Sequence, residues 1–171
     1  MIQLTLWEQL NVGLRRAIPT ALTLLLLLTG VLPWHIHGLS SISVGFVLIS
    51  VYFWTLHQPS LMNMWLVAVI GLAGDILGTA PLGVGVVVLL IAHGLTSTQR
   101  KVLSGAPFIL IWGGFLVIAA VATLLQWLLT SLVEETFIDP QPALFLYVVT
   151  VVCYPPLSYF FNSVQRRVLR V

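Results

Sequence analysis

Long runs of uncharged, apolar residues constrain this chain more than any other feature of its sequence. Six such runs, each 15 to 26 residues long, are separated by charges, proline, glycine or short polar clusters. A helix needs about 20 mainly apolar residues to cross the hydrocarbon core of a bilayer. We therefore expect an all-α integral membrane protein with six transmembrane helices, forming a single membrane domain over residues 1–171. The expected spans are 17–34, 41–57, 61–78, 82–96, 107–132 and 142–162.

The composition excludes an ordinary soluble domain. Only 7% of the residues are charged, and the mean hydropathy is +1.07, which lies outside the range of soluble globular proteins. Continuous apolar runs favour helices over barrel strands, because barrel strands are about ten residues long and alternate in polarity. No loop between the runs is long enough to hold a folded soluble domain.

The basic residues predict the orientation of the chain, because loops rich in lysine and arginine stay in the cytoplasm. With six spans, all seven basic residues fall on one side of the membrane, and Glu134, Glu135 and Asp139 fall on the other. Both termini are therefore expected in the cytoplasm. The excess of basic residues reflects this uneven distribution of charge across the membrane and does not indicate a nucleic-acid-binding surface. The expected cytoplasmic anchors are Arg15, Arg16, Arg100, Lys101, Arg166, Arg167 and Arg170.

The N-terminal segment places basic residues before an apolar run, as a signal peptide does. The apolar run is long for a signal peptide, and the sequence GVLPWHIHG that follows it has no small-x-small cleavage site. We expect an uncleaved anchor. A short interfacial amphipathic helix over residues 1–16 is a further interpretation of this segment.

The sequence GLAGDILGTAPLGVG, residues 71–85, joins the third and fourth runs through a very short connection. Three of its glycines recur at helical spacing, which allows helix backbones to approach closely. We interpret this stretch as a structural or partner-contact motif. Its residues are Gly71, Gly74, Asp75, Gly78, Pro81, Leu82 and Gly83.

The boundaries of this hairpin are also predicted from its residue types. Gly78 or Thr79 is expected to end the third helix, and Pro81 suits the first turn of the fourth. The fourth run has only 15 residues, too few to cross about 30 Å of hydrocarbon at 1.5 Å per residue. We therefore expect this segment to be tilted, or to be buried by its neighbours.

Asp75 is a carboxylate between two of the most apolar runs, and three roles are open for it. It could accept hydrogen bonds from N–H groups at the start of the fourth helix, where the helix dipole also favours negative charge. It could instead contact a ligand or partner, or relay protons. An intramembrane carboxylate costs about 2.5 to 3.5 kcal/mol at the bilayer centre, so Asp75 should face protein or water.

Residues for catalysis or metal binding are scarce. His93 is the nearest candidate base for Asp75, but helix geometry places it about 12 Å away in depth. His35 and His37 form an H-x-H pair, which is weak evidence for a metal because three or four ligands are needed. Common nucleophile, zinc and phosphate-binding motifs are absent from the sequence. We predict no catalytic, cofactor-binding or metal site and no enzyme activity.

Two adjacent prolines lie in the middle of the sixth run. Pro155 and Pro156 remove backbone donors from a helix interior, so they predict a kink in the last span.

The stretch YFWTLHQPSLMNMWLVAVIGLAGDILGTAPLGVGVVVLLIAHGL, residues 52–95, resembles the rod shape-determining protein MreD family. The family pattern is an aromatic helix ending near a proline, a glycine-rich helix with an aspartate, small residues, P-L-G, and an apolar helix before a basic loop. Here Pro59, Asp75 and residues 81–83 carry that pattern. The chain has Gly78 and Thr79 where the family often has serine and then glycine.

The resemblance implies an inner-membrane scaffold of the bacterial cell-elongation machinery. It implies binding to the bitopic protein MreC and, through it, association with the MreB filament, RodA and a class B penicillin-binding transpeptidase during lateral peptidoglycan synthesis. The family also looks related to substrate-binding subunits of energy-coupling-factor transporters. A second hypothesis is therefore a transporter-type subunit that binds a vitamin or lipid-like molecule, and an intramembrane enzyme is a third.

Overall fold

Helices make up nearly all of the part of the chain that the structure describes. The computed structural model describes residues 19–28, 39–78, 81–135 and 139–168, and within these ranges it contains six helices and no strand. The all-α class predicted from the sequence is confirmed. The helices are Pro19–Leu28, α2 (Leu39–His57), α3 (Met64–Leu77), α4 (Val84–Leu103), α5 (Phe108–Val133) and α6 (Gln141–Val168).

Several sequence-based expectations fall on residues outside the described ranges. They concern the interfacial segment 1–16, the histidines at 35 and 37, and part of the first span. The anchors Arg15, Arg16 and Arg170 also lie outside these ranges.

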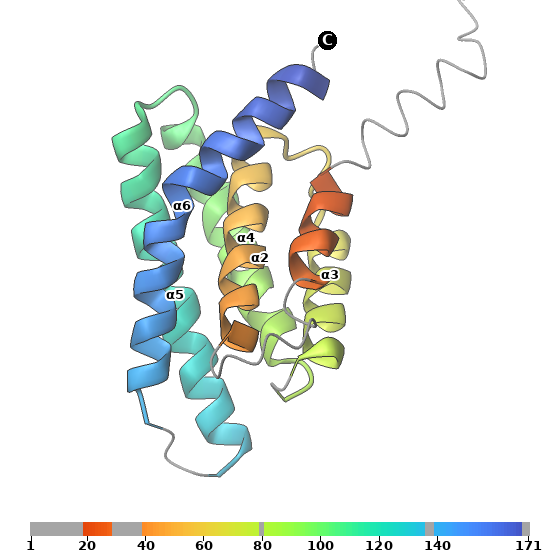
Figure 1. The fold of residues 1–171 in the computed structure, drawn as a ribbon, viewed down its shortest axis with the longest axis vertical. Helices are drawn as coiled ribbons and strands as arrows, with labels where there is room; N and C mark the ends of the chain where they lie inside the picture. Colours follow the sequence, from red (N-terminus) through yellow and green to blue (C-terminus); the bar gives the residue numbers. More distant parts are fainter. Residues whose placement is uncertain (1–18, 29–38, 79–80, 136–138, 169–171) are drawn as a thin grey trace, which may run out of the picture.

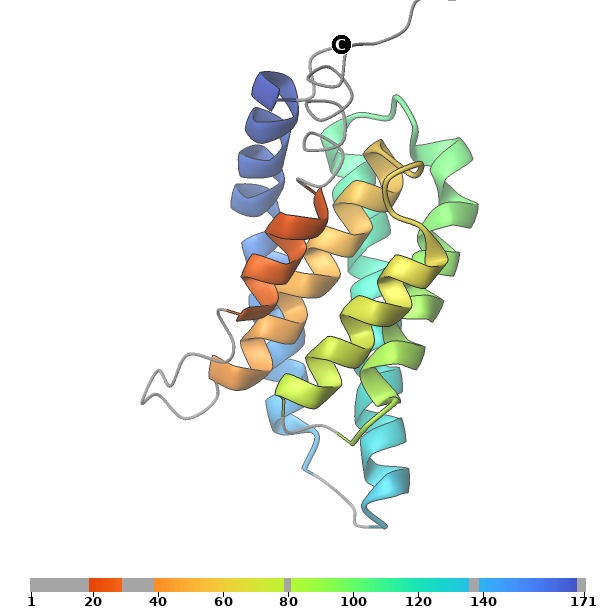
Figure 2. The same cartoon turned by 90° about the vertical axis from the view of Figure 1, so that its right-hand side faces the viewer.

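The helices form a bundle in which α2 is central. It packs against α4 on one side and α6 on another, while α5 packs against both α4 and α6, and α3 runs along α4. The two views show the helices lying side by side, with the short helix Pro19–Leu28 next to α2 (Figures 1 and 2). Every residue of α2 from Val47 to Leu56 is buried, as expected for a helix that is apolar all round.

Aromatic rings from α2, α5 and α6 fill the centre of the bundle. Tyr52 packs against Phe115 with 5.1 Å between ring centroids and against Tyr154 with 5.7 Å. Phe115 and Tyr154 stack on each other at 4.3 Å. Trp54 meets Phe161 at 5.9 Å nearer the end of α6. These contacts join three helices that are distant in sequence, so the core depends on the whole bundle.

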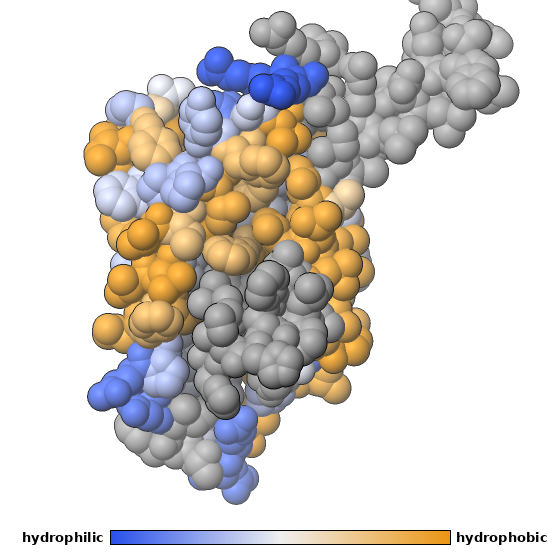
Figure 3. All heavy atoms as spheres, in the orientation of Figure 1, coloured by the Kyte–Doolittle hydropathy of each residue, from blue (hydrophilic) through white to orange (hydrophobic). Residues whose placement is uncertain are grey.

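The outside of the bundle is apolar as well. Val117, Leu124 and Leu128 of α5 are exposed, as are Phe145 and Val152 of α6. Figure 3 shows a hydrophobic belt between two hydrophilic ends. Phe108–Val133 and Gln141–Arg167 are each long and apolar enough to cross a membrane. Large apolar side chains that surround an already packed core are suited to contact with lipid.

α4 is longer than the apolar run that predicts it. It spans 20 residues, about the length needed to cross the hydrocarbon core. From the last residue of the apolar run onward, the hydroxyls of Thr96, Ser97 and Thr98 donate to the carbonyls four residues earlier, so polar side chains continue the helix. The apolar part of α4 is still short, and among the described helices only two others are long and apolar enough to cross a membrane.

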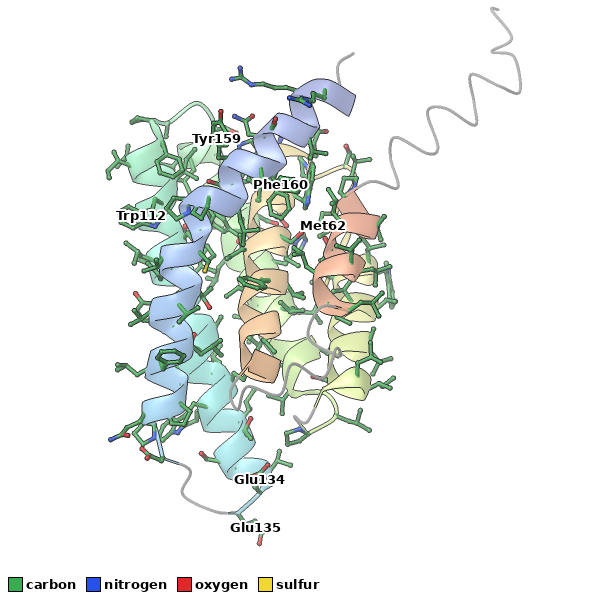
Figure 4. The ribbon with its side chains drawn as sticks, viewed as in Figure 1. Met62, Trp112, Glu134, Glu135, Tyr159 and Phe160 are labelled. Atoms are coloured by element: carbon green, nitrogen blue, oxygen red, sulfur yellow. The ribbon has the colours of Figure 1, made fainter. Side chains whose placement is uncertain are left out.

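Charged residues are separated between the two ends of the bundle. The last turn of α4 carries Arg100 and Lys101, and the last turn of α6 carries Arg166 and Arg167. Both turns lie at the same end of the bundle (Figure 1). The acidic residues that follow α5, Glu134 and Glu135, lie at the opposite end (Figure 4).

α6 continues as one helix through Pro155 and Pro156. The part of α6 that carries Tyr159 and Phe160 leans away from the direction of the first part (Figure 4). Pro155 has no N–H to donate to the carbonyl four residues earlier, which is that of Val151. That carbonyl accepts a hydrogen bond from the indole of Trp112 on α5, at 3.3 Å.

Candidate functional site

The carboxylate of Asp75 lies in the last turn of α3 and faces the beginning of α4. Its Oδ2 accepts hydrogen bonds from the backbone N–H of Gly83 at 2.8 Å and of Val86 at 3.4 Å, and its Oδ1 accepts from Gly85 at 3.0 Å. Asp75 is only 5% exposed. The first N–H groups of a helix lack partners within that helix. Asp75 therefore supplies, from a neighbouring helix, the acceptor that an N-cap side chain normally provides.

Glycine is required at the start of α4 because of this arrangement. The N-cap residue Gly83 has φ 97°, a left-handed conformation with no side-chain cap of its own. A Cβ on Gly85 would collide with the Asp75 carboxylate. A side chain at either position would strain the backbone or displace the carboxylate.

The three glycines expected on one face of α3 have three different surroundings. A Cβ on Gly71 would lie 2.7 Å from the backbone Cα of Val86, so here α3 and α4 approach backbone to backbone. Gly74 lies against the helix Pro19–Leu28, where an added Cβ would be 3.4 Å from a Leu27 methyl group. Gly78 is the C-cap of α3 and donates to the carbonyl of Gly74 at 2.8 Å.

The turn between the helices differs in part from the sequence prediction. Gly78 ends α3 as predicted. Pro81 does not lie in the first turn of α4, since the helix begins three residues later at Val84, whose N–H donates to the Pro81 carbonyl. The left-handed Gly83 explains the difference, because it prevents the helix from beginning earlier. Leu82, between them, is 72% exposed.

His93 does not pair with Asp75. Its Nδ1 lies 2.9 Å from the hydroxyl of Thr55, so it joins α4 to α2. The hydrogen bonds of Asp75 within the described residues all come from backbone N–H groups. Within the same ranges, no three His, Cys, Asp or Glu side chains are grouped so that they could hold a metal ion.

Sequence reasoning missed the polar contacts between distant helices. Thr23 and Ser50 hydroxyls lie 2.7 Å apart and are buried, and the Tyr52 hydroxyl donates to the carbonyl of Ile111 at 2.8 Å. The available signal was the presence of single hydroxyl residues inside apolar runs. Such residues commonly hydrogen-bond between membrane helices.

The residues of the hairpin belong to a pattern that extends over almost the whole chain. The sequence profile of the rod shape-determining protein MreD family matches residues 13–164. The chain belongs to the MreD family. Searches of curated proteins and of solved structures gave no significant match. The resemblance inferred from the sequence is therefore confirmed at the level of the family.

Membership of the MreD family fixes the general role of the chain. It is a membrane protein of a structural family that takes part in determining rod shape, as part of the cell-shape elongation complex. The two membrane-capable helices and the apolar belt around the bundle agree with this location. In this MreD protein the Asp75 cap joins α3 to α4 through three hydrogen bonds.

Proposed function

We propose that this MreD protein is a single membrane domain that crosses the bacterial inner membrane six times, with both termini in the cytoplasm. The helix bounds support this proposal, since each expected span contains one described helix or most of one. The shared position of Arg100, Lys101, Arg166 and Arg167 at one end supports the orientation. The acidic end would then face the periplasm.

The proposed function is that of a scaffold in lateral peptidoglycan synthesis. The chain would bind an MreC-like bitopic membrane protein and so be linked to the MreB filament, RodA and a class B penicillin-binding transpeptidase. Membership of the MreD family is the observation that carries this proposal. The apolar outer surface is suited to packing against another transmembrane helix as well as lipid.

The glycines of the hairpin motif support a structural role more than a partner contact. Gly71 and Gly85 already meet Val86 and Asp75 within the chain. A partner helix would therefore pack on outward side chains and not in this glycine-lined contact. The transporter-type alternative is not favoured by the family, and we propose no catalytic role.

Topology can be tested with single cysteines. Cys153 is the only cysteine of the chain, so a Cys153→Ala background allows Ser104→Cys and Glu134→Cys to be labelled separately. Both sites are exposed and lie at opposite ends of the bundle. In intact spheroplasts an impermeant thiol reagent should label residue 134 only, and residue 104 should react after permeabilisation. The opposite pattern would reverse the proposed orientation, and labelling of both sites before permeabilisation would exclude six spans.

The scaffold proposal is tested by purification in mild detergent. The full chain should retain an MreC-like protein at a stoichiometric level without any added small molecule. Mass spectrometry of the same preparation detects a tightly bound metabolite if one is present. A bound metabolite together with no protein partner would reject the scaffold in favour of the transporter-type subunit.

A further inference from the structure

A partly open hollow lies at the basic end of the bundle, between the ends of α2 and α4 and the start of α5. Leu56, Leu103 and Ile111 form its apolar part. Polar groups come from His57, Arg100 and Ser104. The hollow is at the opposite end from the Asp75 cap and shares no residue with it.

Arg100 is held at this hollow by one of its nitrogens. Its Nε donates to the carbonyl of Leu56 at the end of α2, at 3.3 Å. Within the described residues this is the hydrogen bond of the Arg100 side chain, so its two Nη groups remain as donors at the hollow. A guanidinium fixed in this way presents planar donors that match the oxygens of a phosphate group.

The charges around the hollow are unbalanced. Of the described acidic residues, Asp75 is held at the start of α4, and Glu134, Glu135 and Asp139 lie in and beside the connection between α5 and α6. All of these are at the other end of the bundle (Figures 1 and 4). The first turn of α5, which contributes Ile111 to the wall, brings the positive end of a helix dipole, whereas α2 and α4 bring negative ends, so the positive charge of the site comes from the Arg100 guanidinium. The site therefore favours an anion.

Large exposed apolar side chains flank the lining residues of this site in the sequence, at the end of α4 and the start of α5. Val102, next to Leu103, is 81% exposed, and Phe108 and Ile109 at the start of α5 are 50% and 63% exposed. Free inorganic phosphate has no apolar part, so contact with these side chains would add nothing to its binding free energy. The acyl chains of a lipid would cover them and remove apolar surface from water.

We propose that the hollow binds the phosphate headgroup of an anionic phospholipid, with Arg100 as the main contact. The phosphate chemistry is shared with free inorganic phosphate, and the apolar surroundings favour the lipid. Basic pockets between membrane helices are suited to such headgroups. This site does not depend on the proposed MreC-like partner, and its test requires only the purified chain.

The test compares lipid retention by native mass spectrometry of the full chain in detergent. With phosphatidylglycerol, Arg100→Gln should lower retention about tenfold, because a charge-assisted contact is lost. Lys101→Gln removes the same charge from a neighbouring side chain that does not line the hollow, and retention should change less than about twofold. Phosphatidylglycerol should be retained in preference to phosphatidylcholine by the original chain.

A second variant distinguishes loss of the binding site from loss of stability if Arg100→Gln lowers the melting temperature. Ser104→Leu fills the hollow and keeps every charge, so it should also reduce retention while the melting temperature stays within the range of Lys101→Gln. Equal losses in Arg100→Gln and Lys101→Gln would overturn the proposal, since they indicate a diffuse surface charge. Unchanged retention in both hollow variants, or complete displacement of the lipid by millimolar inorganic phosphate, would also overturn it.

Discussion

The indole N–H of Trp112 donates to the carbonyl oxygen of Val151, the carbonyl that Pro155 leaves without its helical donor. α5 therefore satisfies a backbone group that the proline sequence of α6 frees. In the core of a membrane no water is present to donate a hydrogen bond to such a carbonyl, so the donor must come from the protein, here from another helix. Figure 4 shows Trp112 beside α6, where this bond forms.

Replacing this indole should weaken the bundle. Trp112→Phe keeps an aromatic ring but leaves the Val151 carbonyl unpaired, and the expected loss is about 1 kcal/mol in the free energy of unfolding. The measurement is thermal or denaturant unfolding in detergent. Trp65→Phe is the matched control, because Trp65 is 81% exposed. Equal stability of the two variants would show that the bond to Val151 contributes nothing.

Substitutions at Asp75 should separate its hydrogen-bonding role from its charge. Asp75→Asn keeps one acceptor oxygen, which can serve Gly83 and Val86, and loses the bond to Gly85. We expect it to retain most of the folded protein. Asp75→Leu leaves all three N–H groups unpaired and should lower the free energy of unfolding by about 3 kcal/mol or more. We therefore expect much less of this variant to accumulate in the membrane.

The control for Asp75 is a second capping aspartate. Asp139 accepts from the N–H of Gln141 at the start of α6 but is exposed. Asp139→Asn should change stability by only a few tenths of a kcal/mol, because asparagine caps helices about as well as aspartate. Complete loss of rod shape with normal accumulation in both Asp75 variants would instead indicate a role that requires the charge.

Two glycine-to-alanine substitutions should have opposite effects. At Gly71 the new methyl group would lie 2.7 Å from the Val86 Cα, so α3 and α4 must separate, at a cost of about 1 to 3 kcal/mol. At Gly94 an added Cβ would meet no atom within 4 Å outside the neighbouring backbone of its own helix, and alanine should stabilise α4 by about 0.5 to 1 kcal/mol. Melting temperatures in detergent measure both. A stabilising Gly71→Ala would refute the close packing of these helices.

The contact between Thr55 and His93 should be measurable as a coupling between α2 and α4. Thr55→Val removes the hydroxyl with little change in shape, and we expect a loss of about 1 kcal/mol. Thr98→Val is the control, since the Thr98 hydroxyl is exposed and bonds only within α4. A double-mutant cycle with His93→Leu should give a coupling energy clearly above zero. A coupling of zero would show that the two side chains act independently.

Local features of this chain could be predicted from its sequence. The helical class follows from uncharged runs that are too long and too continuous for barrel strands. The contact between Asp75 and the start of α4 was one of the three roles open to this carboxylate, and it was expected from the N–H groups and the helix dipole at the start of the fourth helix. The end of α3 was expected at Gly78 or Thr79, and Gly78 is its C-cap.

Long-range features could not be predicted in the same way. Tyr52 and Ile111 are 59 residues apart, and Thr55 and His93 are 38 apart. Such pairs leave no periodic signal, because the two partners lie in different apolar runs and nothing in either run indicates which residue of the other it meets. The polar extension of α4 was missed for another reason, since hydropathy measures compatibility with lipid and does not measure helical hydrogen bonding. The hollow beside Arg100 combines a long-range contact, from Arg100 to Leu56, with the polar extension of α4.

The Asp75 cap also bears on how the protein is made. In the proposed six-span topology, α3 enters the bilayer before α4 is made, and its carboxylate then has none of the three N–H groups that stabilise it in the finished fold. Those donors are made only with the start of the next helix, at Gly83, Gly85 and Val86. We therefore expect α3 and α4 to leave the insertion machinery together as a helical hairpin, and a nascent chain that stops before α4 to hold α3 poorly in the membrane.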